Sequence, residues 1–143
     1  MSKPSVPTSR SFPHSRSYQA YRIAVLLTAI GVLAQAITAG LLMSYPGGRA
    51  LHGASAGFLV LAALAMLVTG ILVWRAGGGP GRIALGGLGM LLIVVVQAML
   101  GVAHVKWAHV PLGVLMWGGV LTQVTQLWAR PRRTKRDEAL ATA

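Results

Sequence analysis

Four long stretches without a charged residue divide this chain of 143 residues. The stretches are residues 23–48, 50–74, 83–105 and 107–129. An α-helix needs about 20 mostly apolar residues to cross the ~30 Å hydrocarbon core of a bilayer, so each stretch fits one crossing. The sequence therefore predicts an all-α integral membrane protein, a bundle of four transmembrane helices. The predicted spans are about 22–43, 51–74, 83–105 and 109–129.

The basic residues are unevenly distributed among the segments that connect these spans. The chain has 13 Lys and Arg against two Asp and Glu, a net charge of +11. Only Arg49 and Lys106 lie between spans 1 and 2 or between spans 3 and 4; the other eleven lie before span 1, between spans 2 and 3, or after span 4. Connections rich in Lys and Arg stay in the cytoplasm. We therefore expect both termini to be cytoplasmic. The membrane that we expect is a bacterial plasma membrane.

The two ends of the chain differ in composition from the spans. Residues 1–20 are rich in Ser, Pro and Arg and have no apolar periodicity, so we expect a disordered basic tail. Residues 130–143 form a second basic tail, and residues 21–129 form one membrane domain. The tails favour contact with anionic lipid headgroups. Binding to nucleic acid is disfavoured, because no recognisable nucleic-acid-binding fold or aromatic platform accompanies the charge.

Cysteines and acidic residues, which often carry chemistry, are absent from the spans. The chain has no Cys, which excludes disulfides, thiolate metal sites and redox thiols. Its only acidic residues are Asp137 and Glu138 in the C-terminal tail. The spans therefore have no carboxylate for a proton relay, for cation coordination or for acid–base catalysis.

The first and second pairs of spans repeat the same order of residues. The shared elements are a Gln in the first span of the pair, a basic residue three positions before a His, and glycines after that His. They are Gln35, Arg49, His52, Gly53 and Gly57 in the first pair and Gln97, Lys106, His109 and Gly113 in the second. Both pairs run in the same direction. We therefore predict two repeated helical hairpins, related by a pseudo-two-fold axis along the membrane normal.

This repeat places two histidines at the same depth near the outer face of the membrane. His52 belongs to the second helix and His109 to the fourth, and alternate helices of a four-helix bundle can face each other across its core. Two imidazoles that approach a cavity from opposite sides are the ligand set of a bis-histidine b-type haem. The glycines after each His would leave room for the porphyrin. Arg49 and Lys106 could pair with the two propionates.

Two further polar residues near the middle of the membrane need hydrogen-bond partners. These are Gln35 and Gln97. We expect them to contact each other or a helix backbone in preference to the edge of a ligand, because a buried amide costs free energy unless it is hydrogen-bonded.

Other interpretations of the histidines stay open. A His at a helix start can simply lie in the headgroup region and bond to water or to a loop carbonyl. His104 could join the pair as a third ligand of a zinc or copper site, and Met43 would suit copper. The glycine-rich helix faces also suit a haem-free accessory or assembly subunit that packs against a larger membrane complex.

The His-bearing segments resemble a known family. "LHGASAGFLVLAALAMLV" (51–68) and "AHVPLGVLMWGGVL" (108–121) look like the His-bearing helices of haem A synthase, whose two four-helix halves each hold a His pair. The resemblance implies that His52 and His109 are axial ligands and that His104 is an additional outer histidine. The family enzyme has a Glu three residues before a ligand His, where this chain has Arg49 and Lys106. The resemblance therefore favours the fold and haem binding over synthase activity.

A bis-histidine site also restricts the function that we expect. Iron with both axial positions filled has no open position for a substrate, which favours an electron carrier over an enzyme. We expect a role in electron transfer or in service to a respiratory or haem-handling complex. One haem near one face cannot carry electrons across the bilayer alone, so we expect a membrane redox partner or a second copy of the chain.

Overall fold

The computed structural model describes residues 15–129, which form four α-helices joined by short connections. The helices are α1 (Arg16–Ser44), α2 (Gly48–Arg75), α3 (Arg82–Val102) and α4 (Lys106–Trp128). Each is long and apolar enough to cross a membrane. The prediction of four apolar helices is confirmed. The predicted tails lie largely outside the described residues.

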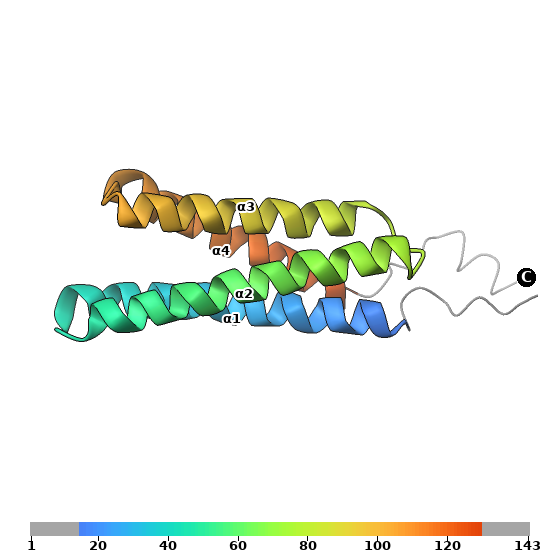
Figure 1. Ribbon diagram of the computed structural model, residues 1–143, viewed down its shortest axis with the longest axis horizontal. Helices are drawn as coiled ribbons and strands as arrows, with labels where there is room; N and C mark the ends of the chain where they lie inside the picture. Colours follow the sequence, from blue (N-terminus) through green and yellow to red (C-terminus); the bar gives the residue numbers. More distant parts are fainter. Residues whose placement is uncertain (1–14, 130–143) are drawn as a thin grey trace, which may run out of the picture.

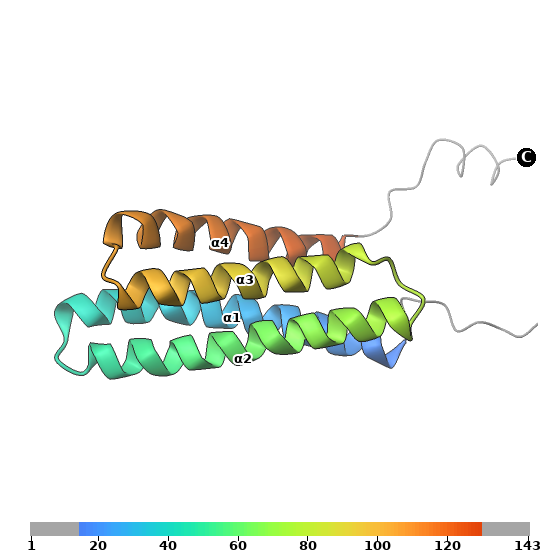
Figure 2. The same cartoon turned by 45° about the horizontal axis from the view of Figure 1, so that its top comes forward.

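The four helices form one closed bundle (Figure 1, Figure 2). Each helix packs against the next one along the chain, and α4 also packs against α1, so α2 and α4 lie diagonally across the bundle. The α1–α2 and α3–α4 turns lie at one end, which we call the histidine end. The start of α1, the end of α4 and the α2–α3 connection lie at the other end, which we call the termini end.

The helix boundaries differ from the predicted spans at several ends. α1 begins at Arg16, so residues 16–20, expected in the disordered tail, are helical. The Ser15 side chain accepts a hydrogen bond from the Tyr18 backbone N–H at 3.2 Å, and such a cap stabilises the first turn. α3 ends at Val102 rather than at 105, and α4 begins at Lys106 rather than at 109.

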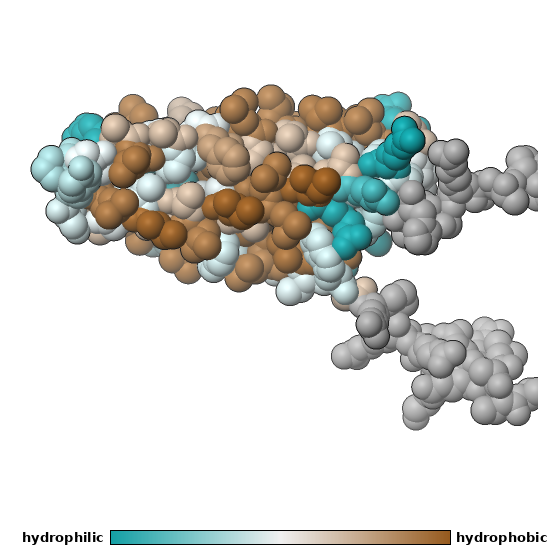
Figure 3. Space-filling view, turned by 90° about the horizontal axis from the view of Figure 1, so that it is seen from below, coloured by the Kyte–Doolittle hydropathy of each residue, from teal (hydrophilic) through white to brown (hydrophobic). Residues whose placement is uncertain are grey.

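The outside of the bundle is mostly apolar. Large aliphatic side chains face outward on all four helices, among them Ile23, Leu61, Leu85 and Leu115. On the face in Figure 3, apolar residues cover most of the length of the bundle and hydrophilic residues gather at its two ends. Soluble monomers rarely expose apolar patches of this extent. The surface is compatible with an integral membrane protein.

The core contains small side chains where neighbouring helices approach each other most closely. An ideal Cβ at Gly87 of α3 would lie 2.7 Å from the Cα of Leu67 in α2. Because that neighbour is backbone, no side-chain movement can make room. An ideal Cβ at the adjacent Gly86 would meet only the Gln123 and Tyr21 side chains, at 3.9 and 4.0 Å, which is ordinary van der Waals contact.

We expect these adjacent glycines to respond oppositely to substitution by Ala. Gly87→Ala should destabilise the bundle by about 1–3 kcal/mol, because the added methyl group forces α2 and α3 apart. Gly86→Ala should leave stability unchanged or raise it by up to about 1 kcal/mol, since Ala favours helix over Gly. Thermal unfolding of both variants in the same detergent measures the difference. Equal destabilisation of the two would contradict the close approach at Gly87.

Candidate functional site

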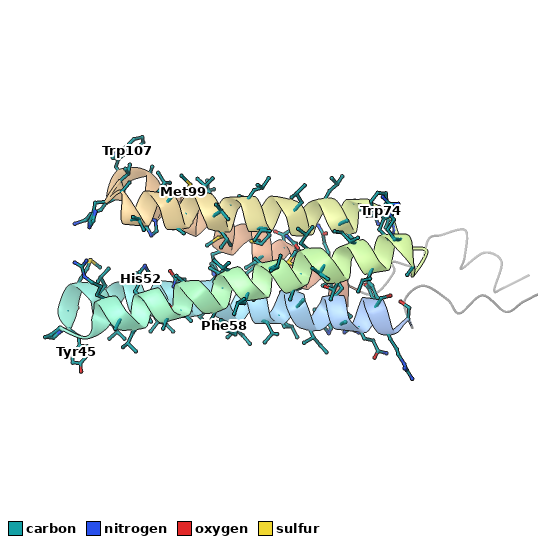
Figure 4. All side chains as sticks on the ribbon, in the orientation of Figure 1. Tyr45, His52, Phe58, Trp74, Met99 and Trp107 are labelled. Carbon is teal, nitrogen blue, oxygen red and sulfur yellow. The ribbon has the colours of Figure 1, made fainter. Side chains whose placement is uncertain are left out.

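The two histidines of the repeat meet at the histidine end of the bundle. His52 lies near the start of α2 and His109 in the first turn of α4. Their ring centroids are 6.5 Å apart, with 66° between the ring planes, and both residues are half-buried. Figure 4 shows His52 on the side of α2 that faces α3 and α4, whereas Trp107 points away from the bundle. The diagonal placement of α2 and α4 thus brings the two rings together across the core.

The hydrogen bonding of His109 determines which ring nitrogen is available. Its Nδ1 lies 3.0 Å from the backbone oxygen of Gln97 in α3. A carbonyl oxygen can only accept, so Nδ1 carries the proton and donates it, and Nε2 keeps a lone pair. An Nδ1–H bonded to a carbonyl is the usual support of a histidine that binds metal through Nε2, because it sets the tautomer and the ring orientation.

The Nδ1 of His52 also has a hydrogen-bond partner, which is a hydroxyl and not a carbonyl. This Nδ1 lies 3.1 Å from Oγ1 of Thr38 in α1. That hydroxyl also lies 2.8 Å from the backbone oxygen of Ala34 and 2.9 Å from Ser55 Oγ, so its single proton has several acceptors within reach. When Thr38 donates to Ala34, it accepts from Nδ1–H of His52, and Nε2 of His52 keeps a lone pair. In the first hairpin the partner of Nδ1 is therefore the Thr38 hydroxyl, whereas in the second hairpin it is a backbone oxygen.

Each repeat Gln holds the backbone of the following histidine. Gln35 Nε2 donates to the backbone oxygen of His52 at 2.9 Å, and Gln97 Nε2 donates to that of His109 at 2.8 Å. This is the helix-backbone contact that we expected for these amides, made at equivalent positions of both hairpins. The repeat in sequence is therefore also a repeat in contacts. Each amide fixes the turn that carries a histidine.

One acceptor at this site has no partner among residues 15–129. Gln97 is 8% exposed, and its buried Oε1 makes no hydrogen bond within the described part of the chain. A buried amide oxygen without a partner is costly, so an additional donor, such as a water molecule, is expected beside it.

The glycines of the site have different environments. An ideal Cβ at Gly113 would lie 2.9 Å from Gln97 Nε2, so this glycine leaves room for the amide that holds His109. Gly53 and Gly57 are exposed, with no neighbouring atom near their ideal Cβ. On a helix, residues one and five positions after His52 point about 100° and 140° away from it. Gly53 and Gly57 therefore do not make room directly above the His52 ring.

Gly101 of α3 also contributes to the site, although the sequence analysis did not select it as a site residue. An ideal Cβ there would lie 3.2 Å from Cε1 of His109. Any larger side chain would press on the imidazole, so Gly101 allows the ring to lie against α3. The signal in the sequence was its position one helical turn after Gln97.

Sequence reasoning also missed two hydroxyl residues, Thr38 and Ser55. Ser55 Oγ lies 2.9 Å from Thr38 Oγ1, accepts from Gln35 Nε2 and donates to the backbone oxygen of His52 at 3.1 Å. Thr38 follows Gln35 by three positions and Ser55 follows His52 by three positions, so helical spacing could have identified both. The second hairpin has Leu100 and Leu112 at the corresponding positions, and the repeat therefore did not draw attention to them.

The remaining candidate ligand, His104, lies apart from the pair. It is exposed in the α3–α4 turn and has a positive φ of 58°, the left-handed conformation that ends α3. Its backbone N–H donates to the backbone oxygen of Gly101 at 3.1 Å. Within residues 15–129, no three His, Cys, Asp or Glu side chains are gathered closely enough to hold a metal ion. The described structure therefore does not assemble the three-histidine zinc or copper site, and Met43 is exposed.

The two basic residues of the repeat lie at the surface of the histidine end. Arg49 is in the first turn of α2 and Lys106 is the first residue of α4, and both are exposed. Each precedes its histidine by three positions, so it lies on nearly the same helix face, toward the end of the bundle. Two positive charges therefore belong to the histidine end, each about one helical turn from a histidine of the pair.

The distance between the imidazoles is suitable for one metal ion. Two imidazoles bound through Nε2 to opposite sides of one first-row metal, with bonds of about 2 Å, have their centroids about 6.3 Å apart. The observed 6.5 Å is close to this value. The Nε2 of His109 has a lone pair for coordination, and the Nε2 of His52 has one when Thr38 accepts from its Nδ1–H.

The assignment of this site depends on its own geometry and chemistry. We find no match between this chain and any protein-family model, curated protein or solved structure. The resemblance of the His-bearing segments to haem A synthase therefore stays a hypothesis, and no family membership is assigned.

Proposed function

We propose that this chain is an integral membrane protein that binds one b-type haem between His52 and His109, near the outer face of the bilayer. The observation that carries the proposal is the histidine pair, with ring centroids 6.5 Å apart and each Nδ1 in a hydrogen bond. Two imidazoles poised in this way across the core of a bundle are the ligand set of a six-coordinate haem iron.

The small number of protein ligands favours haem over a bare metal ion. Structural zinc sites use four protein ligands and catalytic ones use three. Residues 15–129 supply two histidines here and no third gathered ligand. A porphyrin brings four equatorial nitrogens of its own, so two axial imidazoles complete its coordination. The exposed cations Arg49 and Lys106 suit the two propionates at the edge of such a group.

The proposed activity is one-electron transfer. When bound, haem supplies a one-electron Fe(III)/Fe(II) couple. His52 and His109 would hold the iron from both sides, which would leave no iron position for a substrate. The hydrogen bonds from Nδ1 to Thr38 and to the Gln97 carbonyl raise the basicity of the imidazoles, and the two Gln side chains keep the rings in place. A redox partner in the membrane, or a second copy of the chain, would receive the electron.

Aromatic residues at both ends of the bundle support insertion into a bilayer. Tyr45 and Trp107 are exposed at the histidine end, and Trp74 and Trp128 are exposed at the termini end. Trp and Tyr are enriched at the two membrane interfaces. The excess of basic residues at the termini end supports a cytoplasmic location for that end, with the haem site facing the outside.

A reduced-minus-oxidised absorption spectrum of the detergent-purified chain tests the proposal. We expect a low-spin b-type spectrum with one haem per chain, either as isolated or after addition of haemin. A chain that is folded and helical but takes up no haem would contradict the proposal. That outcome would favour a haem-free accessory subunit.

The cations beside the pair provide a second test. Arg49→Gln or Lys106→Gln should each lower the midpoint potential by a few tens of millivolts, because loss of a nearby positive charge favours the ferric state. Potentiometric titration of the purified protein measures the change. Arg82→Gln, at the termini end, is the control with the same charge change and should leave the potential unaltered. Unaltered potentials in both test variants would mean that the cations face lipid headgroups rather than propionates.

A further inference from the structure

A groove between α1 and α4 lies at the termini end, far along the bundle from the histidines. Its volume is about 290 Å³, and it is lined by Gln19, Arg22, Ile23 and Leu26 of α1 and by Trp128 of α4. The four α1 residues follow the spacing i, i+3, i+4 and i+7, which places them on one face of the helix. The groove is therefore a strip of α1 with the Trp128 ring beside it.

The polarity of this groove changes along the bundle axis. Gln19 and Arg22 lie toward the end of the bundle, and Ile23 and Leu26 lie deeper, where they are 58% and 39% exposed. A phospholipid has the same order, with a phosphate at the membrane surface and acyl chains below it. The groove thus offers a cation at the headgroup level and an apolar wall at the chain level.

The Arg22 side chain is held in place but has no charge partner within residues 15–129. Its guanidinium carbon lies 4.3 Å from the centroid of the Trp128 ring, a cation–π contact between α1 and α4. A guanidinium group beside an aromatic ring can still donate hydrogen bonds from its terminal nitrogens. The buried Nε has no hydrogen-bond partner among residues 15–129, a part of the chain that contains no Asp or Glu. A phosphate oxygen at the terminal guanidinium nitrogens would supply the missing counter-charge.

We propose that this groove binds one phospholipid, with the phosphate on Arg22 and an acyl chain against Ile23 and Leu26. The proposal rests on the membrane placement proposed above and does not depend on haem. Anionic lipids should bind best, because the headgroup of a zwitterionic lipid brings a cation of its own to a site that is already positive. The bound lipid would belong to the leaflet at the termini end.

Lipid titration of the detergent-purified chain tests this site, read out by native mass spectrometry at physiological ionic strength. The probes are phosphatidylglycerol, phosphatidylcholine and diacylglycerol with matched acyl chains. We expect one phosphatidylglycerol to be retained per chain, less phosphatidylcholine and no diacylglycerol. Arg22→Gln should weaken retention at least about tenfold, because a charged donor is lost. Trp128→Leu, which keeps the charge but removes the stacking surface, should weaken retention less.

Arg75→Gln is the matched control for charge. Arg75 also stacks on a tryptophan, Trp74, with 4.4 Å to the ring centroid, but both residues are exposed neighbours on α2. This variant should retain lipid within about threefold of the unchanged chain, because an exposed charge is screened by salt. Equal losses in Arg22→Gln and Arg75→Gln would overturn the site in favour of general electrostatic attraction.

Two further outcomes also overturn the proposal. One is that the unchanged chain retains none of the three lipids, which contradicts a lipid site in this groove directly. The other outcome is that lipid binds only after Asp137→Asn and Glu138→Gln are combined, which would show that these two carboxylates of the C-terminal tail pair with Arg22. The haem spectrum of the same samples separates this proposal from the preceding one, since Arg22→Gln should leave it unchanged.

Discussion

Replacing either His52 or His109 by Ala is expected to abolish the low-spin haem spectrum. Each substitution removes one of two axial ligands, and no third ligand is gathered nearby in residues 15–129 to replace it. Haem occupancy should therefore fall by at least about tenfold, or the remaining haem should become high-spin. Absorption spectra and haem-to-protein ratios of the purified variants measure both effects. Size-exclusion chromatography and circular dichroism show whether each variant still folds.

His104→Ala is the matched control for this prediction. His104 belongs to the same end of the bundle but lies exposed in a turn, so its replacement should leave the low-spin spectrum intact. A variant at 104 that loses haem, together with a variant at 109 that keeps it, would show that the pairing of His52 with His109 is wrong. The sequence repeat would then have no bearing on ligation.

Reporters fused after residues 47 and 104 should face the outside, and reporters after residues 78 and 129 should face the cytoplasm. Eleven basic residues belong to the two ends of the chain and to its α2–α3 side, whereas only Arg49 and Lys106 lie near the two turns of the histidine end. Connections rich in Lys and Arg stay in the cytoplasm, so the histidine end should face the outside. Alkaline phosphatase is active only outside the cytoplasm. Green fluorescent protein fluoresces only in the cytoplasm, because it does not fluoresce after export by the general secretion route. Each position should therefore give an all-or-none difference between the two reporters.

This pattern also decides where the histidine pair lies. A reporter result reversed at all four positions would place the pair at the cytoplasmic face and would invert the leaflet that supplies lipid to the Arg22 groove. A reversal at one position alone would contradict the four-span topology.

Several features of the site could be predicted because they depend on spacing along a helix. The repeat of Gln, basic residue and His predicted that His52 and His109 belong to equivalent positions of two hairpins, and the structure places their rings 6.5 Å apart. The expectation that the Gln amides contact a helix backbone agrees with the bonds to the backbone oxygens of the histidines. Equivalent positions in parallel repeats are brought to equivalent depths whatever the details of packing.

Other features could not be predicted from spacing. The sequence assigned Gly53, Gly57 and Gly113 a common role, but only Gly113 is packed against a site residue, and that residue is Gln97. Thr38 and Ser55 support His52 although nothing in the second hairpin corresponds to them. These contacts depend on how far each helix is rotated about its own axis, which is settled by packing against its neighbours.

The sequence alone determined that this chain forms four apolar helices in two similar hairpins. Hydrophobicity over about 20 residues and the uneven placement of charge are properties of each segment by itself, so they need no knowledge of the neighbours. The tertiary structure decided which oxygen atom the Nδ1 of His52 and of His109 contacts, and it separated His104 from them. It also placed Arg22 against Trp128 across a groove. Such relations join side chains on different helices, and only the packed arrangement of those helices brings their atoms within bonding distance.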